Sequence, residues 1–276
     1  MSGFSAEWLE LREPYDTRAT NPAIRDAALA AVRDLDPVNI VDLGCGTGAM
    51  LRLLSPLLPA RQTWRLVDND LGLLGRAADS AKAERVQITA FPLDLARDLE
   101  AALDGAVDLV TTTALLDLVS QEWLDRLVTE IAARRLPFYA TLTYDGRVSF
   151  DPPDRADEAI IAAINEHQRR DKGFGGALGP TAATAGVARL EAVGYSVAHA
   201  RADWEFGPRD REMQTELLAG WAGAARELDD APLADILAWL TRRRDLVAAG
   251  RSSMRVGHVD VFARPIALRP GSRSAK

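Results

Sequence analysis

The sequence predicts an α/β fold: a mostly parallel, doubly wound sheet of seven strands with helices on both faces. From residue 38 to residue 144, short apolar runs rich in β-branched residues alternate with helical segments five times. This alternation favours a parallel sheet with right-handed crossovers. Two late strands, over 195–206 and 254–264, complete the seven, and a pair of amphipathic helices lies between them.

The first predicted strand leads into a glycine turn. The stretch reads VNIVDLGCGTG over residues 38–48, with Gly44, Gly46 and Gly48 at every second position, and a helix is predicted over 49–58. Glycines permit the tight turn and let a ligand approach the backbone, while the amides of the helix N-terminus point at that ligand. The turn therefore predicts a nucleotide-like ligand, and taken alone it also fits a nicotinamide enzyme.

Acidic residues at strand ends sharpen this interpretation. Asp42 stands two residues before Gly44, Asp68 ends the strand over 64–68, and Asp94 follows the strand over 86–93. The series resembles that of class I S-adenosylmethionine-dependent methyltransferases, a Rossmann-like family, of the type that acts on small molecules. The resemblance implies S-adenosyl-L-methionine as cofactor. It also implies the cofactor-binding residues Arg18, Asp42, Gly44, Cys45, Gly46, Gly48, Asp68, Asn69, Asp94, Leu95, Thr112 and Ala114.

The arginine in that set belongs to the segment before the first strand. In related methyltransferases such segments fold over the cofactor, so Arg12 or Arg18 is expected to pair with its carboxylate. The alternative is a surface charge cluster. Two helices, Ala6 to Arg12 and Pro22 to Leu35, are predicted in this part of the chain.

The chain is predicted to form one methyltransferase domain over residues 1–268. Its parts are an N-terminal helical segment (1–36), a cofactor-binding core (37–145), a lid insertion (150–180), an inserted helical pair (207–250) and a tail (265–276) expected to be disordered. The helical pair is expected to extend a cap or to form a homodimer surface.

Composition narrows the class of partner. The chain has 40 acidic and 33 basic residues and a pI near 5.1, which argues against nucleic acid. No apolar run approaches the length of a membrane span, and no signal segment is recognised. The single cysteine, Cys45, leaves neither a disulfide pair nor a thiolate metal site. A cytoplasmic enzyme without a metal, acting on a small molecule, is expected.

Candidate chemistry gathers after the fourth and fifth strands. In-line methyl transfer mainly needs an aligned nucleophile, and a hydroxyl or protonated amine also needs a base. His167 is the first candidate, with Asp171 on the same helix face to orient its ring. Asp117 and Asp145 are the other candidate catalytic residues, although Asp117 also fits a helix cap. Tyr144, Arg170, Lys172 and Phe174 are the candidate substrate residues, and the two cations suit an anionic acceptor.

The sequence thus predicts methyl transfer to an oxygen or nitrogen nucleophile of a small molecule. Two alternatives remain at this point. One is a nicotinamide-dependent oxidoreductase, which the absence of a Tyr-x-x-x-Lys in the expected place disfavours. The other is a protein that binds S-adenosylmethionine without catalysis and acts through its helical cap.

Overall fold

The computed structural model describes residues 4–58, 61–79, 85–228 and 232–266. Within these ranges eight strands form one sheet in the order β3-β2-β1-β4-β5-β8-β6, and the short β7 pairs with β8. The strands are β1 (Val38–Leu43), β2 (Gln62–Asp68), β3 (Val86–Pro92), β4 (Leu109–Thr113), β5 (Phe138–Asp151), β6 (Tyr195–Arg201), β7 (Trp204–Phe206) and β8 (Ser253–Pro265). The first five run parallel, and β8 is antiparallel to β5, β6 and β7.

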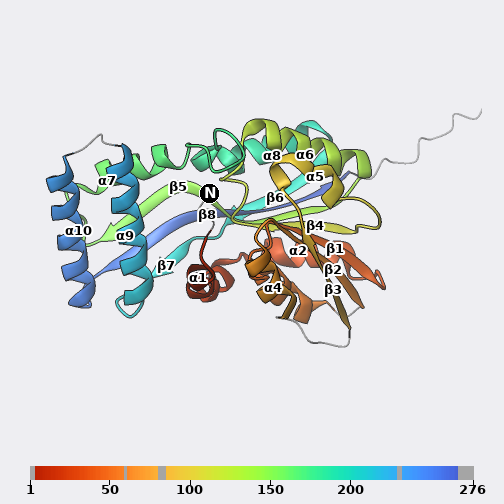
Figure 1. The fold of residues 1–276 in the computed structure, drawn as a ribbon, viewed down its shortest axis with the longest axis horizontal. Coiled ribbons are helices and arrows are strands. Elements are labelled where there is room, and N and C mark those ends of the chain that lie inside the picture. The colour runs from red at the N-terminus through yellow and green to blue at the C-terminus, as the bar shows by residue number, and fades with distance from the viewer. Residues whose placement is uncertain (1–3, 59–60, 80–84, 229–231, 267–276) are drawn as a thin grey trace, which may run out of the picture.

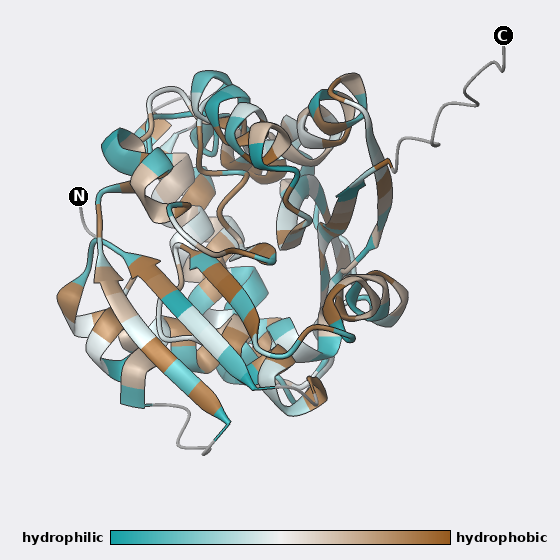
Figure 2. Cartoon of the chain, turned by 90° about the vertical axis from the view of Figure 1, so that its right-hand side faces the viewer, coloured by the Kyte–Doolittle hydropathy of each residue, from teal (hydrophilic) through white to brown (hydrophobic). Residues whose placement is uncertain are grey.

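Helices cover both faces of this sheet (Figures 1 and 2). The described helices are α1 (Ala6–Ala19), α2 (Pro22–Val32), α3 (Ala49–Leu54), α4 (Leu71–Asp79), α5 (Leu95–Ala102), α6 (Gln121–Arg134), α7 (Asp157–His167), α8 (Ala182–Ala192), α9 (Arg211–Leu228) and α10 (Leu233–Ala248). One apolar core lies between the sheet and α5, α6 and α8, and a second between the sheet and α2, α3 and α4. The predicted doubly wound α/β fold is confirmed.

A third core belongs to a cap at one end of the molecule. β5 and β8 run on past the other strands, and α7, α9 and α10 pack against this extension (Figure 1). Phe150 near the end of β5 lies edge-on to Trp221 and Trp239, with ring centroids 5.8 and 6.1 Å apart. The helical pair predicted within residues 207–250 is confirmed as α9 and α10, although residues 229–231 lie outside the described ranges.

Several boundaries differ from the sequence prediction; α2, for example, ends at Val32 instead of Leu35. α1 continues to Ala19 instead of ending at Arg12, because Arg12 and Asp16 form a buried i,i+4 ion pair that spans Pro14. β5 continues beyond Tyr144 to Asp151 because the cap covers its extension.

Two further differences concern the predicted helix over residues 49–58 and the predicted strand over residues 195–206. The helix ends at Leu54 and passes into a 3-10 turn over Ser55–Leu57. The strand divides into β6 and β7 at Ala202 and Asp203, although the Ala202 N–H still donates to the His258 carbonyl of β8. This division makes the eighth strand. In the predicted tail, β8 ends at Pro265, and 267–276 lie outside the described residues.

Candidate active site

The turn between β1 and α3 is shaped by its three glycines. Gly44, Gly46 and Gly48 have φ values of +65°, +54° and +85°, which L side chains rarely adopt. The Cys45 N–H donates to the Val67 carbonyl at 3.0 Å, and this bond holds the turn against the end of β2. The turn therefore presents bare backbone at the carboxyl edge of the sheet, where ligands of doubly wound folds bind.

Two of the predicted cofactor acids meet at this turn. Asp42 is buried, and its Oδ1 accepts from the Thr111 hydroxyl at 2.9 Å, while its Oδ2 has no hydrogen-bond partner in the described chain. Burial raises the pKa of Asp42 to about 7. Asp68 accepts the Gly46 N–H at 2.9 Å, and the exposed Asn69 follows it. The ends of β1 and β2 are thus joined by a carboxylate.

The ends of β3 and β4 bring the other predicted cofactor residues to the same edge. Asp94 is the N-cap of α5 and accepts a backbone N–H at 3.0 Å. The N–H of Leu95 is the first of that helix, so it has no partner within the helix. After β4, the Thr112 hydroxyl donates to the Leu43 carbonyl at 2.8 Å, and Ala114 follows with a φ of 49°. The Thr112 side chain is therefore engaged by the sheet itself.

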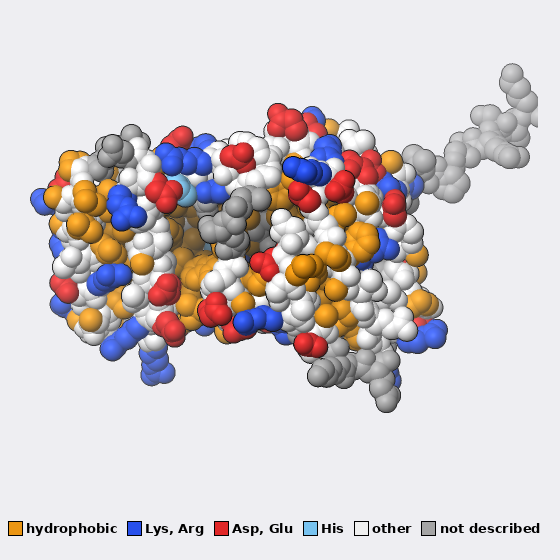
Figure 3. Space-filling view, viewed as in Figure 1, with side chains coloured by type: hydrophobic (Ala, Val, Ile, Leu, Met, Phe, Trp, Pro, Cys, Tyr) orange, Lys and Arg blue, Asp and Glu red, His pale blue; other side chains and the backbone are white. Residues whose placement is uncertain are grey.

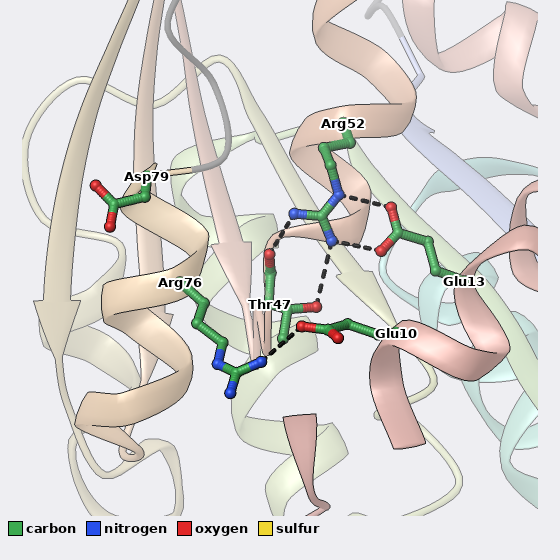
Figure 4. Close-up of a pocket in the computed structure, with 6 residues that line it drawn as sticks. All are labelled: Glu10, Glu13, Thr47, Arg52, Arg76 and Asp79. Carbon is green, nitrogen blue, oxygen red and sulfur yellow. Dashed lines mark hydrogen bonds and ion pairs between the residues drawn. The ribbon is translucent and has the colours of Figure 1, made fainter. Parts of the chain in front are cut away.

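Helix α1 lies over the glycine turn (Figure 4). A Cβ placed on Gly46 would lie 3.2 Å from the Leu9 side chain. Glu13 accepts two hydrogen bonds from Arg52 of α3, and the same guanidinium donates to the Thr47 carbonyl. A second ion pair joins α1 to α4 at 2.6 Å. The segment before the first strand thus covers the turn, as expected from the sequence.

The two arginines of α1 lie in different surroundings. Arg18 is exposed, donates to the Glu205 carbonyl at 2.8 Å and stacks over Tyr15 with its guanidinium carbon 4.8 Å from the ring centre. Arg12 is buried, and its Nε donates to Asp16 at 2.8 Å. Its two terminal nitrogens form no hydrogen bond within the part of the chain that the structure describes. Of the two arginines, Arg12 is therefore the better placed to bind a buried anionic group with its terminal nitrogens.

Asp117 lies just beyond the end of β4, with 5% of its surface exposed. Its Oδ1 has no hydrogen-bond partner among the described residues. Burial raises the pKa of Asp117 to about 6, and backbone N–H groups of Asp117 and Tyr144 and the positive charges of Arg12 and Lys172 oppose that shift. Groups from α1, β5 and the glycine-rich loop after α7 therefore surround this carboxylate.

Tyr144 and Asp145 of β5 have protein partners. The Tyr144 hydroxyl donates to Asn165 Oδ1 of α7 at 2.8 Å, and burial raises the pKa of this phenol. Asp145 accepts from Arg147 Nε at 2.7 Å, and Arg147 also binds Asp203. The Asp145 carboxylate is thus neutralised by an ion pair.

His167 ends α7 and faces the cap. Its Nε2 lies 2.9 Å from Glu227 Oε2 of α9, and its Nδ1 lies 3.3 Å from the Lys172 ammonium. Asp171 does not orient the ring, contrary to the sequence prediction. Its carboxylate instead accepts two glycine N–H groups of the loop at 2.6 and 3.0 Å, because the loop folds back on itself at this point.

The loop after α7 is tightly turned and anchored. Phe174 packs edge-on against Trp123 with ring centroids 5.5 Å apart. The Leu178 N–H donates to the Val119 carbonyl at 2.8 Å, which places this part of the loop beside the segment that follows β4. Arg170 donates to the backbone carbonyl of Glu227 at 3.2 Å.

Several residues near this region were not singled out by the sequence. Glu227 is 60 residues from His167, and no local motif indicates that the two meet. His258 is buried, and its ring centroid lies 4.6 Å from that of Trp204 and 6.1 Å from that of Tyr144. Burial lowers the pKa of His258 to about 3, so the ring is neutral at physiological pH.

The described residues contain no group of three or more histidine, cysteine or acidic side chains arranged to hold a metal ion. No described helix has both the length and the apolar character needed to cross a membrane.

The chain is similar to known proteins both in part of its sequence and in its fold. Residues 40–136 match the family model of a methyltransferase domain. The fold is similar to that of a cyclopropane-fatty-acyl-phospholipid synthase-like protein from Lactobacillus casei, with 14% identity, a TM-score of 0.54, and 94% of each chain covered. A methyltransferase from Thiobacillus denitrificans, solved with S-adenosyl-L-homocysteine, has 17% identity and a TM-score of 0.47, with 95% of this chain and 99% of that chain covered. No curated protein sequence matches the chain.

The matched segment runs from β1 to just beyond α6, so it holds the glycine turn and the acids at the ends of β1, β2 and β3. The strand order places these groups at one edge of the sheet. Residues 40–136 are therefore a methyltransferase domain, and S-adenosylmethionine is its cofactor.

Proposed function

We propose that the protein transfers the methyl group of S-adenosylmethionine to an oxygen or nitrogen nucleophile of a small molecule, with Asp117 as the general base. The observation that carries this proposal is the buried Asp117 carboxylate, whose Oδ1 lacks a hydrogen-bond partner in the described chain. An unpartnered buried carboxylate oxygen is costly. A proton donor on the acceptor would satisfy it.

The proposed reaction moves one proton and one methyl group. The acceptor hydroxyl or ammonium gives its proton to Asp117, the new bond to carbon forms as the sulfur–carbon bond breaks, and S-adenosylhomocysteine leaves as a neutral thioether. A pKa near 6 leaves Asp117 mostly ionised at neutral pH yet basic enough to accept a proton. Asp145 is less suited to this role because Arg147 neutralises it.

The surroundings of Asp117 favour an acceptor that carries an anionic group. The unpaired terminal nitrogens of Arg12 and the ammonium of Lys172 both lie close enough to influence the Asp117 carboxylate. Figure 3 shows the molecule hollowed between the cap and the rest of the protein, with hydrophobic side chains inside the hollow. Such a site suits a small organic anion, whereas the acidic chain is a poor match for nucleic acid.

The test is a screen of small organic acids that carry a hydroxyl or an amino group. Methyl transfer to each compound is measured as release of S-adenosylhomocysteine. On an acceptor so identified, Asp117→Asn should lower kcat by about 100-fold or more, as expected for loss of a general base. For wild type, kcat/KM should rise with pH through about 6, because the base must be ionised. Glu158→Gln, an exposed carboxylate on α7, is the control. Full activity of Asp117→Asn would refute the assignment.

A further inference from the structure

His167 lies between two charged groups from different parts of the chain. Its Nε2 is 2.9 Å from Glu227 Oε2, and its Nδ1 is 3.3 Å from Lys172 Nζ. Because His167 ends α7 and Glu227 belongs to α9, the pair joins these two helices. The His167 side chain is 21% exposed and that of Glu227 is 59% exposed. Both ring nitrogens are therefore engaged by protein groups.

The chemistry of the partners fixes the tautomer of this ring. An ammonium group has three donors and no acceptor, and a carboxylate only accepts. The Nδ1 that faces Lys172 must therefore accept, and the Nε2 that faces Glu227 must carry the proton. A second proton would have to enter at Nδ1, where it would oppose the ammonium. His167 is thus poorly placed to take a proton from an acceptor.

The same contacts hold Lys172 near the proposed base. Lys172 follows directly after the folded-back Asp171, and its charge acts on Asp117. The Gly179 N–H donates to the Asp117 carbonyl at 2.9 Å, so both ends of the loop are tied to the region after β4 or to the cap. Burial lowers the pKa of Lys172, and the charges of Glu227 and Asp117 oppose that shift. Glu227 and Asp117 thus stabilise the charged form of a partly buried ammonium.

We propose that His167 is a positioning residue: together with Glu227 it holds the Lys172 ammonium toward Asp117, where Lys172 binds the anionic group of the acceptor. This inference rests on the proposed function, because it assigns the acceptor's anion to Lys172 and its proton to Asp117. It removes His167 from the proton transfer for which the sequence had suggested it. Glu227, from the cap, becomes part of the acceptor site.

The first test needs no acceptor. Nitrogen-15 NMR of the full chain should show the His167 ring neutral at pH 7.5, with the proton on Nε2. The three histidines are resolved by comparison with His167→Asn. A wild-type ring protonated on Nδ1, alone or together with Nε2, would overturn the proposal.

The second test uses two replacements of the same residue. The Asn amide oxygen can take the place of Nδ1 and accept from Lys172, whereas the longer Gln reaches toward Glu227. His167→Gln and Lys172→Met should raise the acceptor KM about tenfold or more, as for loss of a charged hydrogen bond. His167→Asn should stay within about threefold of wild type, and kcat should change little in all three. Arg169→Met, which removes a neighbouring exposed cation, is the control.

The outcomes separate this inference from the proposed function. If His167→Asn and His167→Gln both lose about 100-fold in kcat, His167 is the base and the positioning role is wrong. If both retain wild-type KM and kcat, neither role holds, while loss of activity in Asp117→Asn would still support the proposed function. If the NMR result is as expected but the screened anionic acceptors are not methylated, the proposed function fails and the acceptor role of Lys172 fails with it.

Discussion

Two regions of the molecule are stabilised by different kinds of contact. One is the cofactor half, which comprises β1 to β4 and the helices α1 to α5, and the other is the cap. Around the glycine turn, the predicted cofactor-binding residues follow strands that are neighbours in the sheet. Hydrogen bonds to backbone groups join them, such as the one from the Gly46 N–H to Asp68. In the cap, side chains meet across long stretches of chain, as when Arg243 of α10 binds Asp157 of α7. The cofactor half is therefore readable as a series of motifs, and the cap is readable only as a set of tertiary contacts.

The largest expected effect tests the dependence of the cap on such contacts. Arg243 is fully buried, and it binds Asp157 and lies 4.1 Å over the Phe150 ring. Arg243→Ala should lower the free energy of unfolding by about 3–5 kcal/mol, because it leaves a buried carboxylate without its partner. Urea unfolding measures this loss. Arg242→Ala, beside it but partly exposed, should cost far less. Equal effects would mean that burial of the pair does not stabilise the cap.

The next effect concerns the cofactor half alone. Asp68→Ala should weaken S-adenosylmethionine binding about 100-fold, roughly 2.7 kcal/mol, because we predict that the Asp68 carboxylate binds the ribose hydroxyls of the cofactor. The unfolding free energy of the cap variant Arg243→Ala should fall without a matching loss of cofactor affinity. Calorimetric titration with S-adenosylmethionine, S-adenosylhomocysteine and NAD measures this, with exposed Glu122→Ala as the control. Binding of NAD in preference to the adenosyl compounds would contradict the assignment.

The buried acid of the glycine turn should make stability depend on pH. Burial raises the pKa of Asp42 to about 7 from its ordinary value of 3.8. The folded state then holds this proton more tightly than the unfolded state, so the contribution to stability is full below pH 4 and is lost as pH rises through about 7.

Asp42→Asn should remove that dependence, since an amide does not titrate in this range. Without cofactor, the unfolding free energy of wild type relative to Asp42→Asn should fall between pH 4.5 and 7.5, by at most about 1.4 kcal/mol per pH unit. Urea titrations at several pH values measure the slope. A constant difference between the two proteins would show that Asp42 does not titrate there.

The smallest effect concerns the junction between α1 and the glycine turn. Glu13→Gln removes an ion pair whose side chains are 23–29% exposed, so stability should change by less than about 1 kcal/mol. Dissociation of S-adenosylmethionine should become a few-fold faster, because α1 covers the turn less firmly. Stopped-flow release measures this rate, and Arg33→Gln, in an exposed ion pair just after α2, is the control. An unchanged rate would mean that the ion pair does not hold α1 over the cofactor.

The sequence by itself determined the alternation of strands and helices and the edge of the sheet at which the glycine turn lies. Buried parallel strands need continuous apolar runs, and the turn from β1 to α3 needs glycines at three left-handed positions, so both leave a local record. Asp42, Asp68 and Asp94 could be placed at one edge because the carboxyl ends of parallel strands share that edge.

Only the tertiary structure decided the partners of the candidate catalytic groups. Residue spacing suggested Asp171 as the partner of His167, because residues four apart on a helix are neighbours. The helix ends at His167, so that spacing no longer applies, and Glu227 from α9 takes the place. The engagement of Asp145 by Arg147 and the burial of Asp117 likewise depend on elements far apart in the chain. Periodicity and motifs report local backbone geometry, whereas such pairings arise from the packing of the cap, α1 and the loop after α7 around the end of the sheet.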